Sequence, residues 1–295
     1  GVKNGIERVS KIMMPVLVVL SCVITVYSVT RPGALEGVKY FLVPNFKNFS
    51  WMTVVTAMGQ MFYSLSIAMG ILITFGSYTE KEVSIENSTE NVEVFDTAIA
   101  IMAGLMIIPA VFAFSNGNME NLNAGPSLMF ITIPKVFDSM GLGTLIGILF
   151  FVLVLFAALT SSIALTECAV STFQDELKWS RHKSVCILGV IMLALGSLSS
   201  LGYGPLASIQ IIGMQFLDFF DFLTNSVMMP ISAICICLLV SKVIGVDKIA
   251  QEVKSHNNPF KREKIFNFMI KYVCPIFAAI ILLSSVANAF GIIKM

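Results

Sequence analysis

Long runs of apolar residues are the feature that most restricts the folds open to this chain. Of its 295 residues, 56% are hydrophobic and 13% are charged, and the mean hydropathy is +0.86. A soluble domain carries about twice that share of charge. Apolar runs of about 18 or more residues are typical of membrane-spanning helices. The sequence therefore predicts an all-α integral membrane protein with the lipid bilayer as its surroundings and no nucleic-acid partner.

Seven transmembrane segments are expected, with charged residues gathered in the loops between them. The segments cover residues 12–30, 51–78, 96–114, 141–176, 183–201, 209–243 and 265–293. In the loop 115–140, Ala124-Gly125-Pro126 and Ile133-Pro134 favour short helices that lie on or dip into the protein. Lysine and arginine are concentrated before the first segment and after the second, fourth and sixth. By the positive-inside rule these loops are cytoplasmic. We therefore expect a multi-pass protein of the cell (inner) membrane with a cytoplasmic N-terminus.

The second segment is expected to be discontinuous. Between Gly59 and Tyr78 an apolar stretch contains Tyr63, two serines and a small-residue step that ends at Gly70. One interpretation is a helix that breaks here, because backbone groups freed in a membrane must line a cavity or bind something. The other is a continuous helix whose serines bond to their own carbonyls and whose glycine is a packing notch.

A second group of small and polar residues interrupts the apolar segment 141–176. Ala157, Thr160 and Ser161 share one helical face, where a carbonyl and two hydroxyls offer three neutral oxygens. Such oxygens suit a cation of low charge, such as sodium. A small-residue packing face with back-bonded hydroxyls is the alternative.

A few carboxylates lie in or beside the apolar segments. Glu167 is deep within one of them, where a carboxylate is functional or paired, and we favour a structural anchor for a neighbouring helix. Asp96 is either a helix N-cap or a cation ligand. Asp218 and Asp221 are solvated acids, caps, or half of a gate. No nucleophile–base pair or zinc-protease motif is present, so an enzyme is not expected.

Taken in order, these motifs closely resemble those of the neurotransmitter:sodium symporter family, in particular its prokaryotic amino acid transporters. The matching stretches are Gly5-Ile6-Glu7-Arg8, Gly59-Gln60, Ser77-Tyr78, Asp96-Thr97, Ala124-Gly125-Pro126, Leu159-Thr160-Ser161-Ser162, Asp175-Glu176-Leu177 and Asp218-Phe219-Phe220-Asp221. The resemblance covers the whole chain and begins at the family's fifth helix. It implies that the chain is a single, partial transmembrane domain that covers the fifth to eleventh helices.

The resemblance also implies how the chain is organised. Residues 1–30 would be the last helix of the first repeat, residues 51–243 the second five-helix inverted repeat, and residues 265–293 an additional helix. Four further N-terminal helices of the same protein would complete the transporter. The chain starts at Gly1 rather than at a methionine, which fits a segment cut from a longer chain.

The function implied is sodium-coupled uptake of amino acids, hydrophobic or neutral, by alternating access. Carried over by position, the substrate pocket would be lined by Tyr63, Ser64, Ser66, Met69, Ser161 and Leu165. Two sodium sites, each partly formed by the absent helices, would use Ser64 and Asp96 in one and Ala157, Thr160 and Ser161 in the other. The outer gate would use Asp221, and the inner gate Asp175, Ser77 and Tyr78.

Three positions depart from the common family pattern. Tyr63 stands where phenylalanine is common, and Met69 stands where other members carry a bulky aromatic residue. Asp96 stands where chloride-dependent relatives use asparagine, so a fixed carboxylate would supply the charge and chloride would not be needed. Two alternatives stay open: a truncated fragment that acts only as an assembly or interaction partner, and a proton-coupled transporter that uses Glu167.

Overall fold

The computed structural model describes residues 2–115, 125–138, 141–255 and 259–291. These residues are helical almost throughout, apart from connecting loops and a single bridge between Ile211 and Met214. Among them, six helical segments are long and apolar enough to cross a membrane: Gly5–Val29, Ile85–Phe114, Gly143–Leu177, Arg181–Leu201, Phe216–Ile244 and Glu263–Ala289. The predicted all-helical membrane architecture is therefore confirmed.

The remaining predicted segment, residues 51–78, is divided between two shorter helices. They are α3 (Trp51–Ser64), with 14 residues, and α4 (Ile71–Tyr78), with 8 residues. Neither reaches the about 20 residues that a helix needs to cross a bilayer alone. Six candidate spans are thus observed where seven were expected, and the count of seven stays a prediction.

The chain divides into two compact units, of which unit 1 comprises residues 1–49 and 93–164. It contains η1 (Val2–Glu7), α1 (Arg8–Val29), α2 (Ala34–Leu42), η2 (Phe46–Asn48), α6 (Gly125–Ser127), η4 (Leu128–Thr132), α7 (Ile133–Asp138) and the larger part of α5 (Ile85–Ser115) and α8 (Gly143–Leu177). Its core gathers side chains from α1, α5, α7 and α8: Leu17, Ile24, Met106, Ala110, Val111, Ile133, Val136, Phe137, Ile146, Phe150 and Leu153. The short helices expected in the loop 115–140 are confirmed for residues 125–138, while Ala124 lies outside the described residues.

Helix α2 approaches α5 closely at a glycine. A Cβ atom built on Gly37 would lie 2.7 Å from the Cα atom of Pro109, a distance that real Cβ atoms essentially never show. Beside this contact the rings of Tyr40 and Phe112 pack with their centroids 5.2 Å apart. The absence of a side chain at Gly37 is therefore what lets the two backbones meet.

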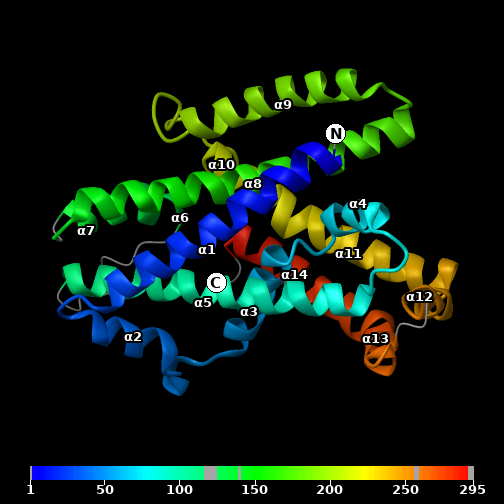
Figure 1. Cartoon of the computed structure of the whole chain (residues 1–295), viewed down its shortest axis with the longest axis horizontal. Helices are drawn as coiled ribbons and strands as arrows, with labels where there is room; N and C mark the ends of the chain where they lie inside the picture. The colour runs from blue at the N-terminus through cyan, green and yellow to red at the C-terminus, as the bar shows by residue number, and fades with distance from the viewer. Residues whose placement is uncertain (1, 116–124, 139–140, 256–258, 292–295) are drawn as a thin grey trace. The chain divides into compact units, whose positions relative to one another are not determined.

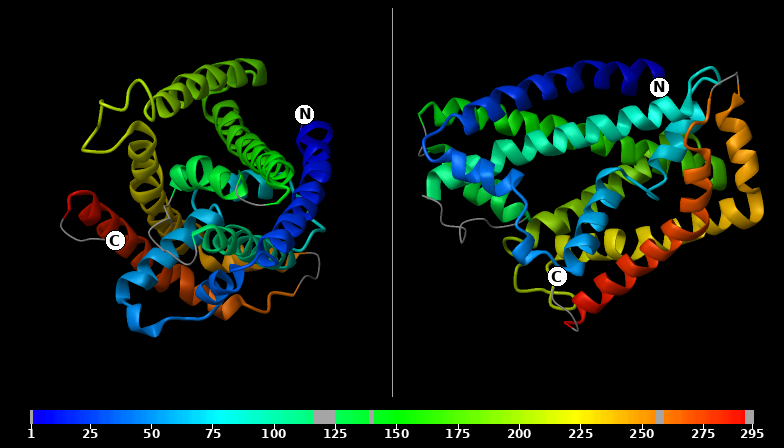
Figure 2. Two further views of the ribbon diagram at one scale, coloured as in Figure 1. Left: turned by 90° about the vertical axis from the view of Figure 1, so that its left-hand side faces the viewer. Right: turned by 90° about the horizontal axis from the view of Figure 1, so that it is seen from below.

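Unit 2 comprises residues 50–92 and 165–295. Besides α3, α4 and the ends of α5 and α8, it contains α9 (Arg181–Leu201), α10 (Phe216–Asp221), η5 (Phe222–Met228), α11 (Met229–Leu238), η6 (Leu239–Ile244), α12 (Val246–Val253), α13 (Glu263–Phe268), η8 (Met269–Val273) and α14 (Cys274–Ala289). Helix α11 (yellow) packs along α14 (red), which also contacts α3 (Figure 1). The same pair can be followed in both views of Figure 2.

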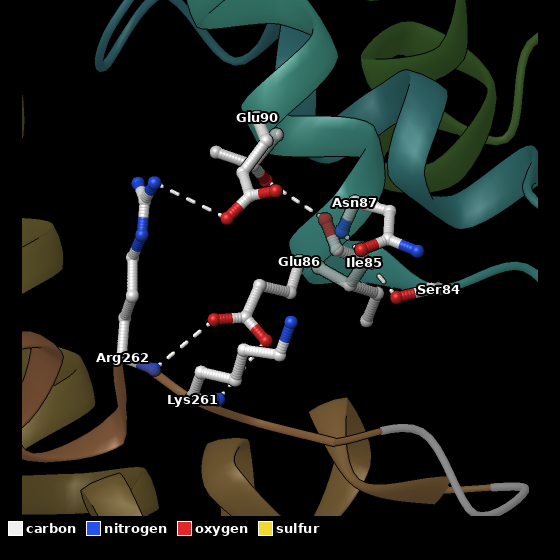
Figure 3. A network of polar contacts seen from close by, with 8 residues as sticks. Ser84, Ile85, Glu86, Asn87, Glu90, Lys261 and Arg262 are labelled. Carbon is white, nitrogen blue, oxygen red and sulfur yellow. Dashed lines mark hydrogen bonds and ion pairs between the residues drawn. The ribbon is translucent and has the colours of Figure 1, made fainter.

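A buried carboxylate joins the beginning of α5 to the beginning of α13. Glu86 is 8% exposed, and its two oxygens accept hydrogen bonds from the backbone N–H groups of Lys261 and Arg262, each at 3.0 Å. The Arg262 guanidinium also pairs with Glu90 at 3.1 Å (Figure 3). Glu86 thus satisfies amides at a helix start, which have no partner within the helix itself.

Two helix boundaries differ from the sequence-based expectation. Helix α5 begins at Ile85 rather than at Asp96, because Ser84 precedes it and its hydroxyl accepts a hydrogen bond from the Asn87 amide at 3.3 Å. The polar residues 85–95 continue the helix instead of forming a loop. The sixth expected segment begins at Phe216 rather than at residue 209, because residues 202–215 form turns and the isolated bridge.

Candidate functional site

The helix break between α3 and α4 is the centre of the candidate site. Residues 65–70 are not helical, and Ser66, Ala68 and Gly70 have positive φ angles of 53°, 63° and 82°. The Ile67 amide donates to the Phe62 carbonyl and the Met69 amide to the Ser66 carbonyl, so the regular helical ladder is interrupted. Residues 65–70 therefore separate α3 from α4, and that the two helices form one discontinuous membrane span stays a prediction.

The break is costly and must be held by its surroundings. Non-glycine residues in the left-handed region cost about 1–3 kcal/mol each and persist only where neighbouring structure fixes them. Ser66 and Ala68 are two such residues, and both are half-buried. Such strain gathers at ligand clamps and active sites, which makes this turn a candidate binding site.

A cavity of about 280 Å³ lies at the C-terminal end of α3 within unit 2. Its wall includes Gln60 and Tyr63 from α3, Asp221 from α10, and Ser285 from α14. The structure therefore brings together Tyr63 and Asp221, which the sequence analysis predicted as a lid and a gate. The carboxylate of Asp221 also accepts a hydrogen bond from the Asn225 side-chain amide at 2.5 Å.

The small-residue face of α8 lies in unit 1 and keeps neutral oxygens close together. The Thr160 hydroxyl donates to the carbonyls of Phe156 and Ala157, both at 3.0 Å. This is the back-bonded geometry of the packing interpretation. Yet a hydroxyl that donates its proton retains lone pairs that can bind a cation. Ala157 and Thr160 are half-buried and Ser161 is exposed, so the packing and sodium interpretations both remain compatible with the geometry.

Asp96 is placed in the interior of α5, where its side chain is half-buried. The N-cap interpretation of this residue is therefore wrong, since the helix starts at Ile85. Asp96, Ala157, Thr160 and Ser161 belong to unit 1, and Tyr63, Ser64, Ser66, Met69 and Leu165 belong to unit 2. Within the described residues, no three His, Cys, Asp or Glu side chains gather as a metal site would require.

The sequence profile described as "Sodium:neurotransmitter symporter family" matches residues 1–292. The chain belongs to this family. It is a family of sodium-coupled transporters rather than of enzymes.

Two relatives of the chain are named as sodium-dependent transporters. A sodium-dependent transporter of Bacillus subtilis (strain 168) is 33% identical over 295 residues, which are 100% of this chain and 64% of that protein. A sodium-dependent transporter of Haemophilus influenzae is 32% identical over 286 residues, which are 97% of this chain and 61% of the relative. The chain therefore spans a little less than two thirds of the length of these symporter relatives.

The fold is also similar to that of a solved structure. A crystal structure of MhsT in complex with L-phenylalanine matches with a TM-score of 0.82 and 37% sequence identity, over 97% of this chain and 64% of that chain. This match confirms the transporter fold. The expectation that four further helices of the same protein complete the site stays a prediction.

Glu167 is a buried and paired carboxylate of this chain. It is 3% exposed, and the Arg181 guanidinium binds its two oxygens at 3.1 and 2.5 Å. The Tyr78 hydroxyl donates to the same carboxylate at 3.1 Å. The expected role as an anchor for a neighbouring helix is confirmed, since Arg181 begins α9 and Tyr78 ends α4. The proton-coupled alternative that would use Glu167 stays a prediction.

The predicted inner-gate residues are placed at the ends of two helices of unit 2. Ser77 donates to the Thr74 carbonyl at 2.7 Å within α4, and Asp175 is exposed in the last turn of α8. Tyr78 is bound to Glu167, a contact not foreseen from the sequence. Arg181 was also missed, although a carboxylate as deep as Glu167 signals that a cationic partner must exist.

Proposed function

We propose that this chain forms part of a sodium-coupled symporter that takes up hydrophobic or neutral amino acids by alternating access. The observation that carries the proposal is the unwound turn 65–70, with positive φ at Ser66, Ala68 and Gly70, in a member of a sodium-symporter family. Discontinuous helices expose N–H and C=O groups that bind substrates and ions inside a membrane. The MhsT structure, which contains L-phenylalanine, supports an amino acid as the substrate class.

In this proposal the substrate contacts the break and the face of α8. Tyr63 closes over the substrate, Ser64 and Ser66 present polar groups, and Met69 provides an adaptable wall. Ser161 and Leu165 line the pocket from α8. The cavity shared by Tyr63 and Asp221 supports a lid and an outer gate at the end of α3. Asp175, Ser77 and Tyr78 serve the inner gate.

Sodium binds at two places in the proposed mechanism. Ser64 and Asp96 contribute to the first site. Ala157, Thr160 and Ser161 contribute the carbonyl and hydroxyl oxygens of the second, which suit a hard monovalent cation. Asp96 carries a fixed negative charge beside the first sodium, and we therefore propose that transport does not require chloride.

The proposed membrane arrangement has seven crossings, of which α3 and α4 together form the discontinuous one. Residues 51–243 form the second inverted repeat, residues 1–30 the last helix of the first repeat, and residues 265–293 an additional helix. The concentration of lysine and arginine supports a cytoplasmic N-terminus and an inner-membrane location.

The test is uptake by the protein expressed from its natural reading frame and reconstituted in liposomes. Radiolabelled L-phenylalanine is expected to accumulate when sodium is high outside, and not when potassium replaces it. Competition by each of the twenty amino acids then defines the substrate class. Uptake of the same size without sodium would favour proton coupling, and no uptake of any amino acid would favour the non-transporting fragment.

A further inference from the structure

The unwound turn 65–70 presents backbone carbonyls that the helix no longer satisfies. Buried carbonyl groups need hydrogen-bond partners, and in a membrane the cost of leaving them unpaired is several kcal/mol each. Two of these carbonyls, on Ala68 and Met69, receive side-chain donors from other helices of unit 2. These two donors differ from every residue assigned above to substrate, sodium or gates.

The first donor is Ser232 on α11. Its hydroxyl donates a hydrogen bond to the Ala68 carbonyl at 3.1 Å, across 164 residues of sequence. Ser232 is half-buried, and Ala68 is one of the non-glycine residues with positive φ. Several described serine hydroxyls within helices bond back to their own helix, as Ser199 does with Leu195 at 3.0 Å. Ser232 instead directs its hydroxyl at the strained residue of the break.

The second donor is Cys168 on α8. Its thiol donates to the Met69 carbonyl with a sulfur–oxygen distance of 3.7 Å. The same sulfur packs on Gly70, because a Cβ atom built on that glycine would lie 3.0 Å from it. Cys168 follows Glu167, whose carboxylate is fixed by Arg181 and Tyr78. The thiol is therefore held in place by an anchored part of α8 directly over the last residue of the turn.

We propose that Ser232 and Cys168 are positioning residues that fix the direction of the carbonyls in the turn 65–70. This inference rests on the proposed function, in which that turn binds amino acid and sodium. The two donors come from two different helices, α11 and α8, so the orientation of consecutive peptide groups is set by side chains outside the turn.

The effect on transport follows from the fraction of molecules in which the turn has its binding geometry. A turn without one of its donors spends a smaller fraction of time in the binding geometry, and the apparent affinity falls by that fraction. Loss of one such hydrogen bond lowers that fraction by about fivefold. High concentrations of ligand restore the competent geometry, so KM for the amino acid and the half-saturating sodium concentration rise while kcat changes little.

The first measurement is hydrogen–deuterium exchange of the peptide that contains residues 65–70, in the purified protein. Ser232→Ala and Cys168→Ala are expected to raise exchange in this segment by about fivefold. Ser232→Thr and Cys168→Ser keep a donor and should stay near the wild-type rate. Ser199→Ala and Cys186→Ala on α9 are matched controls, which should leave the segment unchanged.

The second measurement is initial uptake of L-phenylalanine by the same variants in liposomes with a sodium gradient. The alanine variants should show KM and half-saturating sodium raised by about fivefold, with rescue in the threonine and serine variants. If the wild-type protein takes up no amino acid, the proposed function fails and the exchange data alone decide whether the two side chains hold the turn. Equal exchange in all variants overturns the inference. If the wild-type protein transports, an unchanged KM for L-phenylalanine in the Ser232→Ala and Cys168→Ala variants also overturns the inference.

Discussion

The guanidinium of Arg181 and the carboxylate of Glu167 form a two-point ion pair, with nitrogen–oxygen distances of 3.1 and 2.5 Å. The Glu167 side chain is 3% exposed, whereas the Arg181 side chain is 41% exposed. With the Tyr78 hydroxyl on the same carboxylate, this pair ties α8 to α9 and to the end of α4. The charge of Glu167 is therefore compensated where it lies, and the pair stabilises the part of α8 that holds the helix break.

Removing both partners of this pair should cost less stability than the two single losses added together. Arg181→Ala leaves a buried carboxylate with one hydroxyl donor, and we expect the free energy of unfolding to fall by about 3 kcal/mol. The double variant Glu167→Gln, Arg181→Ala should lose less than the sum of the single variants, because the uncompensated charge is gone. Thermal midpoints in detergent check this. Additive losses in the double variant would contradict the pairing.

The contact of Glu86 with the start of α13 gives a second prediction. Glu86→Ala leaves the backbone amides of Lys261 and Arg262 without the carboxylate that accepts from them, so the free energy of unfolding should fall by about 1–3 kcal/mol. Proteolysis near residues 259–262 should also accelerate. Glu90→Ala is the matched control, since its pair with Arg262 is exposed and should contribute at most about 1 kcal/mol. Equal effects of the two variants would show that the amide contacts of Glu86 do not matter.

Gly70 and Gly76 provide a matched pair of glycines on either side of the start of α4. Gly70 has φ of 82° and Cys168 above it, so Gly70→Ala should destabilise the protein by about 1–2 kcal/mol from the backbone alone. Uptake should fall with it, because the turn can no longer keep its geometry. Gly76 lies inside α4 with nothing within 4 Å of a built Cβ, and Gly76→Ala should be neutral or stabilising by up to about 1 kcal/mol. A Gly70→Ala protein as stable and active as the Gly76→Ala protein would contradict the geometry of the break.

Asp96 carries the prediction on chloride. With Asp96 intact, sodium-driven uptake should be unchanged when gluconate replaces chloride. Asp96→Asn removes the fixed charge, so uptake should weaken and become dependent on chloride. The measurement is initial uptake at several sodium concentrations in both anions. A large loss of wild-type uptake in gluconate would refute chloride independence.

The sequence predicted the all-helical membrane architecture because it depends on local pattern, and the interruption at residues 65–70 also has a local signal. Long apolar runs identify spans, and the serines and Gly70 within one such run identify the break. Asp96 was misplaced because residues 85–95 are polar, and polarity does not distinguish a loop from a helix that continues beyond the apolar stretch. Ser84, which caps that helix, was the local signal that could have corrected it.

The partners of the break could not be predicted from the sequence. Ser232 meets Ala68 and Cys168 meets Met69 across 164 and 99 residues. Which helix faces which depends on packing, and hydrophobic periodicity says little when almost every face of a helix is apolar. Arg181 was missed for a related reason, since a residue in a basic loop resembles an orientation signal until its contact with Glu167 is seen. The roles of Tyr63, Asp221 and the remaining site residues stay predictions.

Sodium-22 binding to the purified protein, with and without saturating L-phenylalanine, tests whether the oxygens around Thr160 and the turn 65–70 hold a cation together with an amino acid. In the proposed mechanism the two ligands strengthen each other, and linkage requires that the factor be the same in both directions. We expect L-phenylalanine to lower the half-saturating sodium concentration, and Thr160→Val to raise it by about tenfold or more because a hydroxyl ligand is lost. Thr172→Val, which removes a similar back-bonded hydroxyl elsewhere on α8, should have no effect. An absence of sodium binding would contradict the proposed mechanism. So would a half-saturating sodium concentration that changes neither on addition of L-phenylalanine nor in the Thr160→Val protein.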